Sequence, residues 1–219
     1  MTGRTFLELI EQGGVVMYPL LVCSVISVGV IIERLWTLGR LQQQSELLAR
    51  HVLEALHDGK VAEASALCRT SKVALATVLR TAISLQGKPA EIVERATVRK
   101  LGEIARSLRQ RIWLLGTVGS LAPFIGLFGT VIGIIRAFES MAATGSGGFA
   151  VVAAGISEAL IATAGGLLVG VLSIFAFNAF NVRINALSAT MRDTADEILE
   201  QIAELPAHEG SVARVVQSR

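Results

Sequence analysis

One acidic residue, Glu158, lies inside the longest apolar stretch of the chain and is the strongest candidate for chemistry. It is the sole carboxylate between Glu139 and Asp193, and its neighbours are mainly apolar or small. An ionisable group at membrane depth is costly unless it is paired, hydrated or protonated, and such groups usually mark an ion or proton pathway. The sequence therefore predicts that Glu158 borders an ion route. The alternatives are that it reaches the outer interface or pairs with Arg136.

Two threonines, Thr130 and Thr163, could assist this carboxylate. Both lie in apolar segments at a depth close to that expected for Glu158, where their hydroxyls could solvate a carboxylate or a chain of water. A threonine in a membrane helix more often donates to a carbonyl of its own helix. The three residues together, rather than either threonine alone, favour an ion pathway.

Small residues recur along the two segments that carry these side chains. Helices in lipid gain no hydrophobic drive to associate, and small residues let their backbones approach closely. Tight packing within one subunit is the simpler interpretation, and a stripe lining a narrow central cavity of an oligomer is the other. The residues of this set are Gly119, Pro123, Gly126, Gly129, Gly133, Gly155, Ala162, Gly166 and Gly170.

Three apolar segments are long enough to hold these residues within a membrane. A spanning helix needs about 20 predominantly apolar residues, and the segments 14–32, 112–138 and 149–182 qualify. Only 17% of the 219 residues are charged, whereas soluble domains average about 25%, and the mean hydropathy is +0.59. These features predict an all-α integral membrane protein with three transmembrane helices.

Lysine and arginine are distributed very unevenly between the segments. The stretch 33–111 carries fourteen of the twenty and the tail 183–219 carries four, whereas Arg4 and Arg136 flank the other side. Because cytoplasmic loops are enriched in these residues, we expect the large loop and the C-terminal tail in the cytoplasm. The N-terminal segment 1–13 and the short link 139–148 then lie outside.

The cytoplasmic parts are predicted to be long helical extensions. Apolar residues recur at helical spacing from Leu41 to Leu56, and Asp58-Gly59 predicts a break. Short helices are expected after it, followed by one that starts at Pro89 and continues into the second span. Beyond the third span the pattern is that of an amphipathic helix, with apolar residues at Ile184, Leu187, Met191, Ala195, Ile198 and Ile202, and residues 205–219 are expected to fray.

Signals for catalysis, cofactors, metals or nucleic acid are absent from the sequence. It contains no Gly-rich phosphate loop, no Gly-x-Ser-x-Gly elbow and no His-Glu-x-x-His helix. Cys23 and Cys68 have neither metal-site spacing nor the pattern of a disulfide framework. The net charge of +2, without a dense basic run, does not indicate nucleic-acid binding. We therefore expect a protein that is not an enzyme.

Two motifs resemble one known family. The run Leu121–Phe138 (LAPFIGLFGTVIGIIRAF) and the run Gly155–Leu168 (GISEALIATAGGLL) are similar to the MotA/TolQ/ExbB proton channel family, and the ExbB/TolQ branch is the nearest pattern. The three-span layout, with the N-terminus outside and a large first cytoplasmic loop, also resembles that branch. Many of its sequences carry a tryptophan where this chain has Ile132, so the subfamily stays open.

The resemblance implies an inner-membrane motor subunit. Five copies would form a ring around the single transmembrane helices of an ExbD/TolR-like partner, which carries an intramembrane aspartate. Proton flow would drive work on periplasmic or outer-membrane targets through a TonB/TolA-like or motility effector. The family's intramembrane glutamate falls on Glu158 and its pore threonines on Thr130 and Thr163. The N-terminal segment and the short link would then be periplasmic.

Two other functions stay open at this point. The chain could be a membrane scaffold that conducts nothing, or a sodium-driven stator subunit. The process that is energised also stays open among transport, envelope integrity and motility, since all three would use the same spans.

Overall fold

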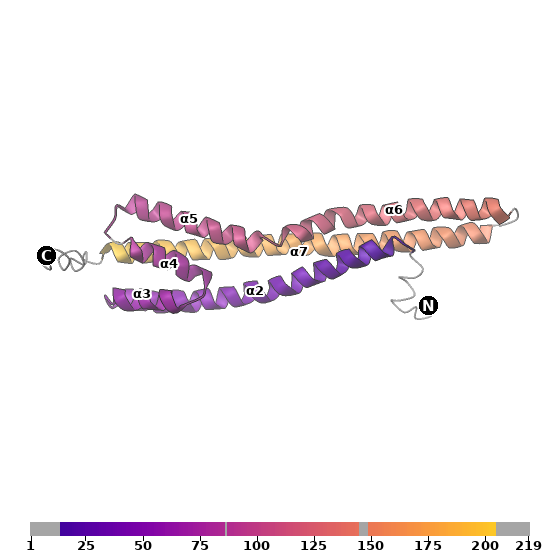
Figure 1. Cartoon of the computed structure of the whole chain (residues 1–219). Helices are drawn as coiled ribbons and strands as arrows, with labels where there is room; N and C mark the ends of the chain where they lie inside the picture. Colours follow the sequence, from indigo (N-terminus) through magenta and orange to yellow (C-terminus); the bar gives the residue numbers. More distant parts are fainter. Residues whose placement is uncertain (1–13, 86, 145–148, 205–219) are drawn as a thin grey trace, which may run out of the picture. The chain divides into compact units, whose positions relative to one another are not determined.

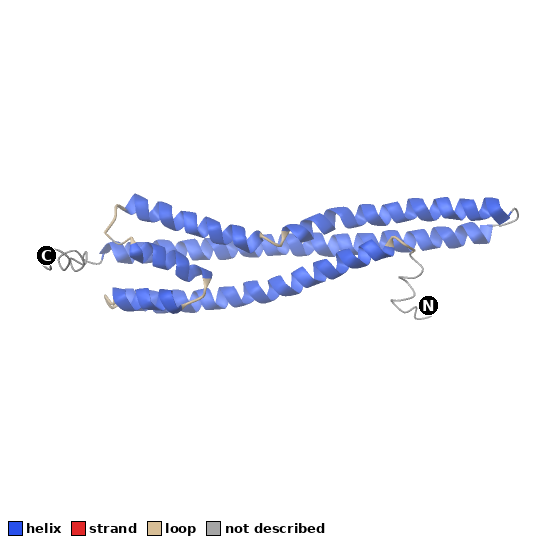
Figure 2. Cartoon of the chain, in the orientation of Figure 1, coloured by secondary structure: helices blue, strands red, loops and turns tan. Residues whose placement is uncertain are grey.

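The computed structural model describes residues 14–85, 87–144 and 149–204, and every regular element in these ranges is a helix (Figure 1; Figure 2). The predicted all-α fold is confirmed. The predicted segments 1–13 and 205–219, and the centre of the link, lie outside the described residues. The helices are, in order, α2 (Met17–His57), α3 (Val61–Thr70), α4 (Ala74–Ser84), α5 (Ala90–Arg109), α6 (Trp113–Thr144) and α7 (Phe149–Glu204).

Three helical stretches are long and apolar enough to cross a membrane. They fall within Met17–His57, Ala90–Ala142 and Val152–Gln201, as the three-span prediction requires. Only 22% to 28% of each most apolar window is buried inside the chain. Most of this apolar surface therefore has to be covered by lipid or by other subunits.

The chain divides into two compact units. One, which we call the apolar unit, contains the described residues up to Leu35 together with Gln110–Val182. The other, the polar unit, contains Trp36–Arg109 and the described residues from Arg183 onward. The helices α2 and α7 each contribute to both units.

The apolar unit is held together by α2, α6 and α7. Its core cluster is formed by Leu20, Val118 and Ala122, with Met17, Cys23, Ile125 and Val169 packed around it. A buried hydrogen bond of 2.8 Å joins the hydroxyls of Ser27 on α2 and Ser173 on α7. The helix α6 passes through Pro123 without interruption. At about 1.5 Å per residue its 32 residues measure about 48 Å, more than the roughly 30 Å of hydrocarbon.

The polar unit has its own helical core. Ile184, Leu187, Met191, Ala195 and Ile198 are buried, at spacings of three and four residues, which confirms the amphipathic pattern expected beyond the third span. The helix α3 packs on α4, and α4 packs on α5. Because α4 is buried along most of its length, it forms the centre of these three helices.

The helix α2 ends where the sequence predicts a break. Gly59 has a φ of +73°, and its N–H donates to the carbonyl of Leu56 while the N–H of Lys60 donates to that of Ala55. This is the Schellman arrangement, in which a left-handed glycine closes a helix. The expected continuous helix from Pro89 into the second span is instead interrupted by a turn at 110–112, between α5 and α6.

Candidate functional site

Glu158 lies on α7 in the apolar unit, nine residues after the helix begins at Phe149. Its side chain is exposed on the chain and makes no hydrogen bond or ion pair with the residues that the structure describes. It lines a cavity of about 240 Å³ between the start of α2, α6 and α7. The carboxylate therefore lies in a solvent-accessible cavity of the apolar unit, beside Gly14, rather than in its packed interior.

The cavity around Glu158 is apolar apart from two charged groups. Arg136 of α6 lines it together with Glu158, while the other walls come from small and aliphatic residues and Phe128. No ion pair joins Glu158 to Arg136. The structure thus gives no support to the alternative in which Arg136 neutralises Glu158 directly. The remaining wall residues are Gly14, Val15, Val16, Pro19, Ile125, Gly129, Ile132, Gly133 and Ala159.

Gly14 lies beside the carboxylate, with no room for a side chain between them as they stand. A Cβ atom placed on it would lie 2.8 Å from Oε1 of Glu158, closer than real Cβ contacts allow. Its φ of +67° is also a conformation that favours glycine. The residue was not among the predicted site residues. Its only sequence signal is the pair Gly13-Gly14 directly before an apolar run, which indicates a turn but not a partner.

The two predicted threonines use their hydroxyls to bond backbone carbonyls. Thr163 of α7 donates to the carbonyl of Gly126 on α6 at 2.9 Å, which links the two helices. Thr130 donates to the carbonyl of Leu127 in its own helix at 2.6 Å. Neither threonine lines the cavity that holds Glu158. The structure therefore brings Glu158 together with Arg136 and Gly14, and places the threonines in and beside the contact of α6 with α7.

The small residues of α6 and α7 face each other at van der Waals contact. A Cβ atom on Gly166 would lie 2.6 Å from the carbonyl oxygen of Ala122 and 2.9 Å from Cα of Gly126. Toward the Glu158 end, Gly133 meets Ala159 and Gly155 meets Ala137 in the same way. The other contacts of this kind are those of Gly119 with Ile174, Gly129 with Ala162 and Gly170 with Pro123.

This geometry places one ionisable group in largely apolar surroundings. Glu158 is carried by a helix that packs closely on α6 through Gly133, Ala159 and Gly155, so its backbone is held near α6. Over the described ranges, no group of three or more His, Cys, Asp or Glu residues is placed to hold a metal ion. A single exposed carboxylate in apolar surroundings can exchange a proton or order water, and both are steps of ion transfer.

Comparison with known proteins gives a consistent result. The family model described as "MotA/TolQ/ExbB proton channel family" matches residues 68–193, more than half of the chain. The matched range contains the whole of α6 and the part of α7 that carries Glu158.

Several curated proteins are similar to this chain. "Putative biopolymer transport protein ExbB-like 1" of Synechocystis is 36% identical over 82% of this chain and 71% of its own length. "Biopolymer transport protein ExbB" of Salmonella typhimurium is 40% identical over 46% of this chain and 41% of its own. "Tol-Pal system protein TolQ" of Haemophilus influenzae is 43% identical over 42% and 40%. The similarity to the last two therefore spans less than half of their lengths.

Proposed function

Because the chain belongs to the MotA/TolQ/ExbB proton channel family, we propose that it is the ion-conducting subunit of a bacterial inner-membrane motor. Five copies would form a ring around an ExbD/TolR-like single-span partner that carries an intramembrane aspartate. Proton flow through this assembly would drive work on periplasmic or outer-membrane targets. As a member of this family, the chain is a multi-pass membrane protein of energy-transducing complexes. The ring of five, the partner and the direction of work are what we propose beyond this.

The observation that carries the proposal is the unpaired Glu158. A carboxylate exposed on an apolar helix has to be hydrated, protonated or matched by another subunit. No described residue of this chain pairs with it. A central, hydrated lumen shared with the partner's aspartate would meet this requirement, whereas a surface turned toward hydrocarbon would not.

In the proposed pathway both threonines belong to the wall, and Thr163 joins the two helices that form it. The Thr163 hydroxyl donates to the Gly126 carbonyl and so holds α7 against α6, and both of its lone pairs stay available to accept from water. Thr130 lies four residues beyond Gly126 on α6, so both threonines flank the same helix contact. Each proton crossing about 100 mV would supply roughly 2.3 kcal/mol, enough to bias a conformational step.

The decisive experiment replaces Glu158 by glutamine. We expect Glu158→Gln to abolish proton flux through the subunit reconstituted with its partner in vesicles, because the amide cannot ionise. Native mass measurement should still give a complex of five chains of 23.2 kDa with the partner. A pH-sensitive dye inside the vesicles reports the flux.

Glu139→Gln is the matched control, since Glu139 is another exposed acid of the apolar unit and does not line the Glu158 cavity. It should leave the flux unchanged, and Glu158→Asp should leave part of it, because the shorter stem misplaces the carboxylate. Full flux in Glu158→Gln would show that the role given to Glu158 is wrong. Flux that follows a sodium gradient would instead identify a sodium-driven stator. If the unmodified complex conducts neither ion, the protein is a scaffold.

A further inference from the structure

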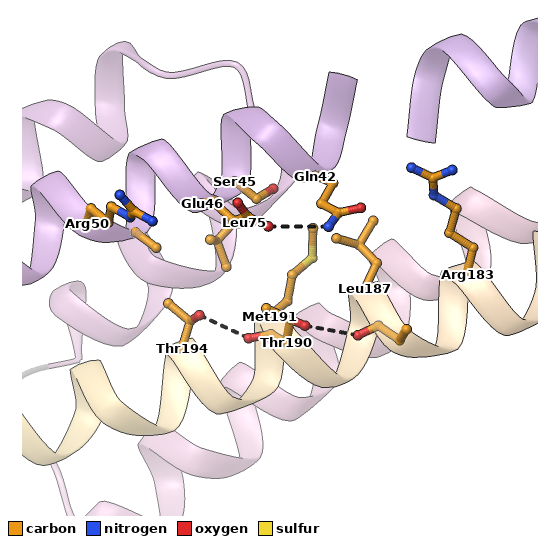
Figure 3. A pocket seen from close by; sticks show the side chains of 12 residues that line it. Gln42, Ser45, Glu46, Arg50, Leu75, Arg183, Leu187, Thr190, Met191 and Thr194 are labelled. Carbon is orange, nitrogen blue, oxygen red and sulfur yellow. Dashed lines mark hydrogen bonds between the residues drawn. The ribbon is translucent and has the colours of Figure 1, made fainter. Parts of the chain in front are cut away.

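A second cavity lies in the polar unit, apart from the Glu158 site. It has a volume of about 260 Å³ and is bordered by α2, α7 and Leu75 of α4 (Figure 3). We call it the Arg183 cavity. Figure 3 shows the guanidinium groups of Arg50 and Arg183 at its two ends, with Leu187, Met191 and Thr190 between them. At about 30 Å³ per water, the space could hold roughly nine water molecules, more than a single small ion needs.

The polar groups around the Arg183 cavity leave hydrogen-bond donors unused. Ser45 is only 4% exposed, yet its buried hydroxyl has no hydrogen-bond partner among the described residues. Buried polar groups are normally paired, so an orphaned hydroxyl calls for an explanation such as a bound group. Arg50 and Arg183 also make no ion pair or hydrogen bond with the described chain.

Other polar side chains around the cavity already make hydrogen bonds within the protein. Glu46 accepts a hydrogen bond of 3.3 Å from the Gln42 side chain, one helical turn earlier. The hydroxyls of Thr190 and Thr194 donate to carbonyls of their own helix at 3.2 and 2.9 Å. The donors left over are the guanidinium groups of Arg50 and Arg183 and the Ser45 hydroxyl. Because these two arginines face a single carboxylate, that of Glu46, the charged side chains of the lining carry a net positive charge. This favours a ligand that brings acceptors and negative charge.

The remaining wall is apolar. Leu75, Leu187 and Met191 are nearly fully buried side chains that also line the cavity, so part of the ligand would rest on hydrocarbon. Arg183 directly follows Val182, the last residue of the apolar unit. Basic residues that immediately follow a membrane span are the usual partners of anionic lipid head groups.

We propose that the Arg183 cavity binds a phosphate-bearing ligand, with the phosphate at Arg183 and the less polar part against Leu187 and Met191. Arginine suits this role because its planar fork can donate two parallel hydrogen bonds to a phosphate. Ser45 then donates to an oxygen of the same ligand. The phosphate could come from an anionic phospholipid or from a soluble phosphate ester, and both sources share this recognition.

Binding to the intact, delipidated protein in a neutral detergent tests the proposal. Bound phosphatidylglycerol is counted by native mass spectrometry in competition with phosphatidylcholine, and glycerol phosphate binding is measured by calorimetry. We expect Arg183→Gln to weaken binding at least tenfold, whereas Arg192→Gln on the same helix should not. Thr190→Trp should fill the cavity and block binding, whereas Ala189→Trp, on the neighbouring exposed position that does not line it, should leave binding intact.

Each outcome decides the proposal. Binding of phosphatidylglycerol that both cavity variants remove supports a lipid source, and binding of glycerol phosphate alone, removed by the same variants, supports a soluble source. Equal weakening by Arg183→Gln and Arg192→Gln would show general charge attraction and overturn the site. The proposal would also be overturned if the unmodified protein bound neither probe, or if it bound phosphatidylglycerol no better than phosphatidylcholine and did not bind glycerol phosphate. None of these measurements depends on ion conduction.

Discussion

At the scale of single residues, Gly14 lies so near Glu158 that a Cβ atom on it would require the carboxylate to move. We expect Gly14→Ala to displace the carboxylate or the start of α2, because the new Cβ atom would lie 2.8 Å from Oε1. The left-handed backbone adds a strain of about 1 to 2 kcal/mol for a non-glycine residue. Proton flux in reconstituted vesicles should therefore fall several-fold, while the native mass of the complex stays unchanged.

Gly29→Ala is the control for this prediction. Gly29 lies in the same unit, and its Cβ would meet no described atom within 4 Å beyond its chain neighbours and the nearby backbone of its own helix. If Gly14→Ala conducts as well as Gly29→Ala, the close approach of Gly14 has no part in positioning Glu158.

A second residue-scale prediction concerns Cys68, which is buried on α3. Burial raises the pKa of this thiol to about 11, and the thiolate is the reactive form. At pH 7 we expect alkylation of Cys68 to be about a hundredfold slower in the folded protein than in urea, two pKa units being two factors of ten. The rate is measured by mass spectrometry in a Cys23→Ser background.

The same pKa shift makes the stability of the polar unit depend on pH. The folded thiol holds its proton to a higher pH than the unfolded one, so its contribution to stability is complete below about pH 9. That contribution is lost as the pH rises toward 11. Equal alkylation rates in folded and denatured protein would contradict the burial of Cys68.

Sequence alone could identify Glu158 but not its surroundings. A single acidic residue in an apolar run can be recognised from the sequence, because the free energy of burying its charge depends on its depth in the membrane. Its closeness to Gly14 depends on how α2 is placed against α7, and no local pattern encodes it. The hydroxyl of Thr163 likewise could not be assigned from sequence, since its acceptor belongs to another helix.

At the scale of helices, the contact of α6 with α7 depends on glycine at facing positions. We expect Gly166→Ala to separate the helices, because its Cβ atom would lie 2.6 Å from the Ala122 carbonyl oxygen and a backbone atom cannot rotate away. Overpacking of this kind typically costs about 1 to 3 kcal/mol. The measurement is the thermal unfolding midpoint in detergent, which should fall.

The adjacent Gly165→Ala is a close control, because its Cβ atom would meet only Met17 and Leu20 at 3.7 Å or more. Both variants add the same methyl group and the same gain in helix propensity. If the two midpoints shift equally, the small residues do not set the distance between α6 and α7.

The helix boundaries show which signals a sequence carries. A glycine with positive φ follows the end of α2, at Gly59, and the end of α4, at Gly87. Glycine is a common turn residue, so the sequence predicts both breaks. The turn between α5 and α6 contains neither glycine nor proline and reads Gln110-Arg111-Ile112. A helical pattern runs through it, which is why the sequence predicted one continuous helix there.

At the scale of the whole molecule, charge and apolar surface are separated between the two units. The apolar unit leaves large side chains exposed on all three of its helices, among them Tyr18, Phe124 and Phe175. The polar unit carries most of the lysine and arginine. Because lysine and arginine are enriched in cytoplasmic segments, the proposed orientation puts the polar unit in the cytoplasm.

This orientation is open to a direct test with single cysteines in a Cys23→Ser, Cys68→Ser background. Ala142→Cys lies at an exposed position near the end of α6, whereas Thr70→Cys and Glu200→Cys lie at exposed positions of the polar unit. We expect an impermeant maleimide added to intact spheroplasts to label Ala142→Cys alone, and to label the other two after lysis. The physical reason is that positively charged segments are retained on the cytoplasmic side. Labelling of Thr70→Cys in intact spheroplasts would show that the topology is the reverse of the proposed one. The proposed direction of work on periplasmic targets would then be wrong as well.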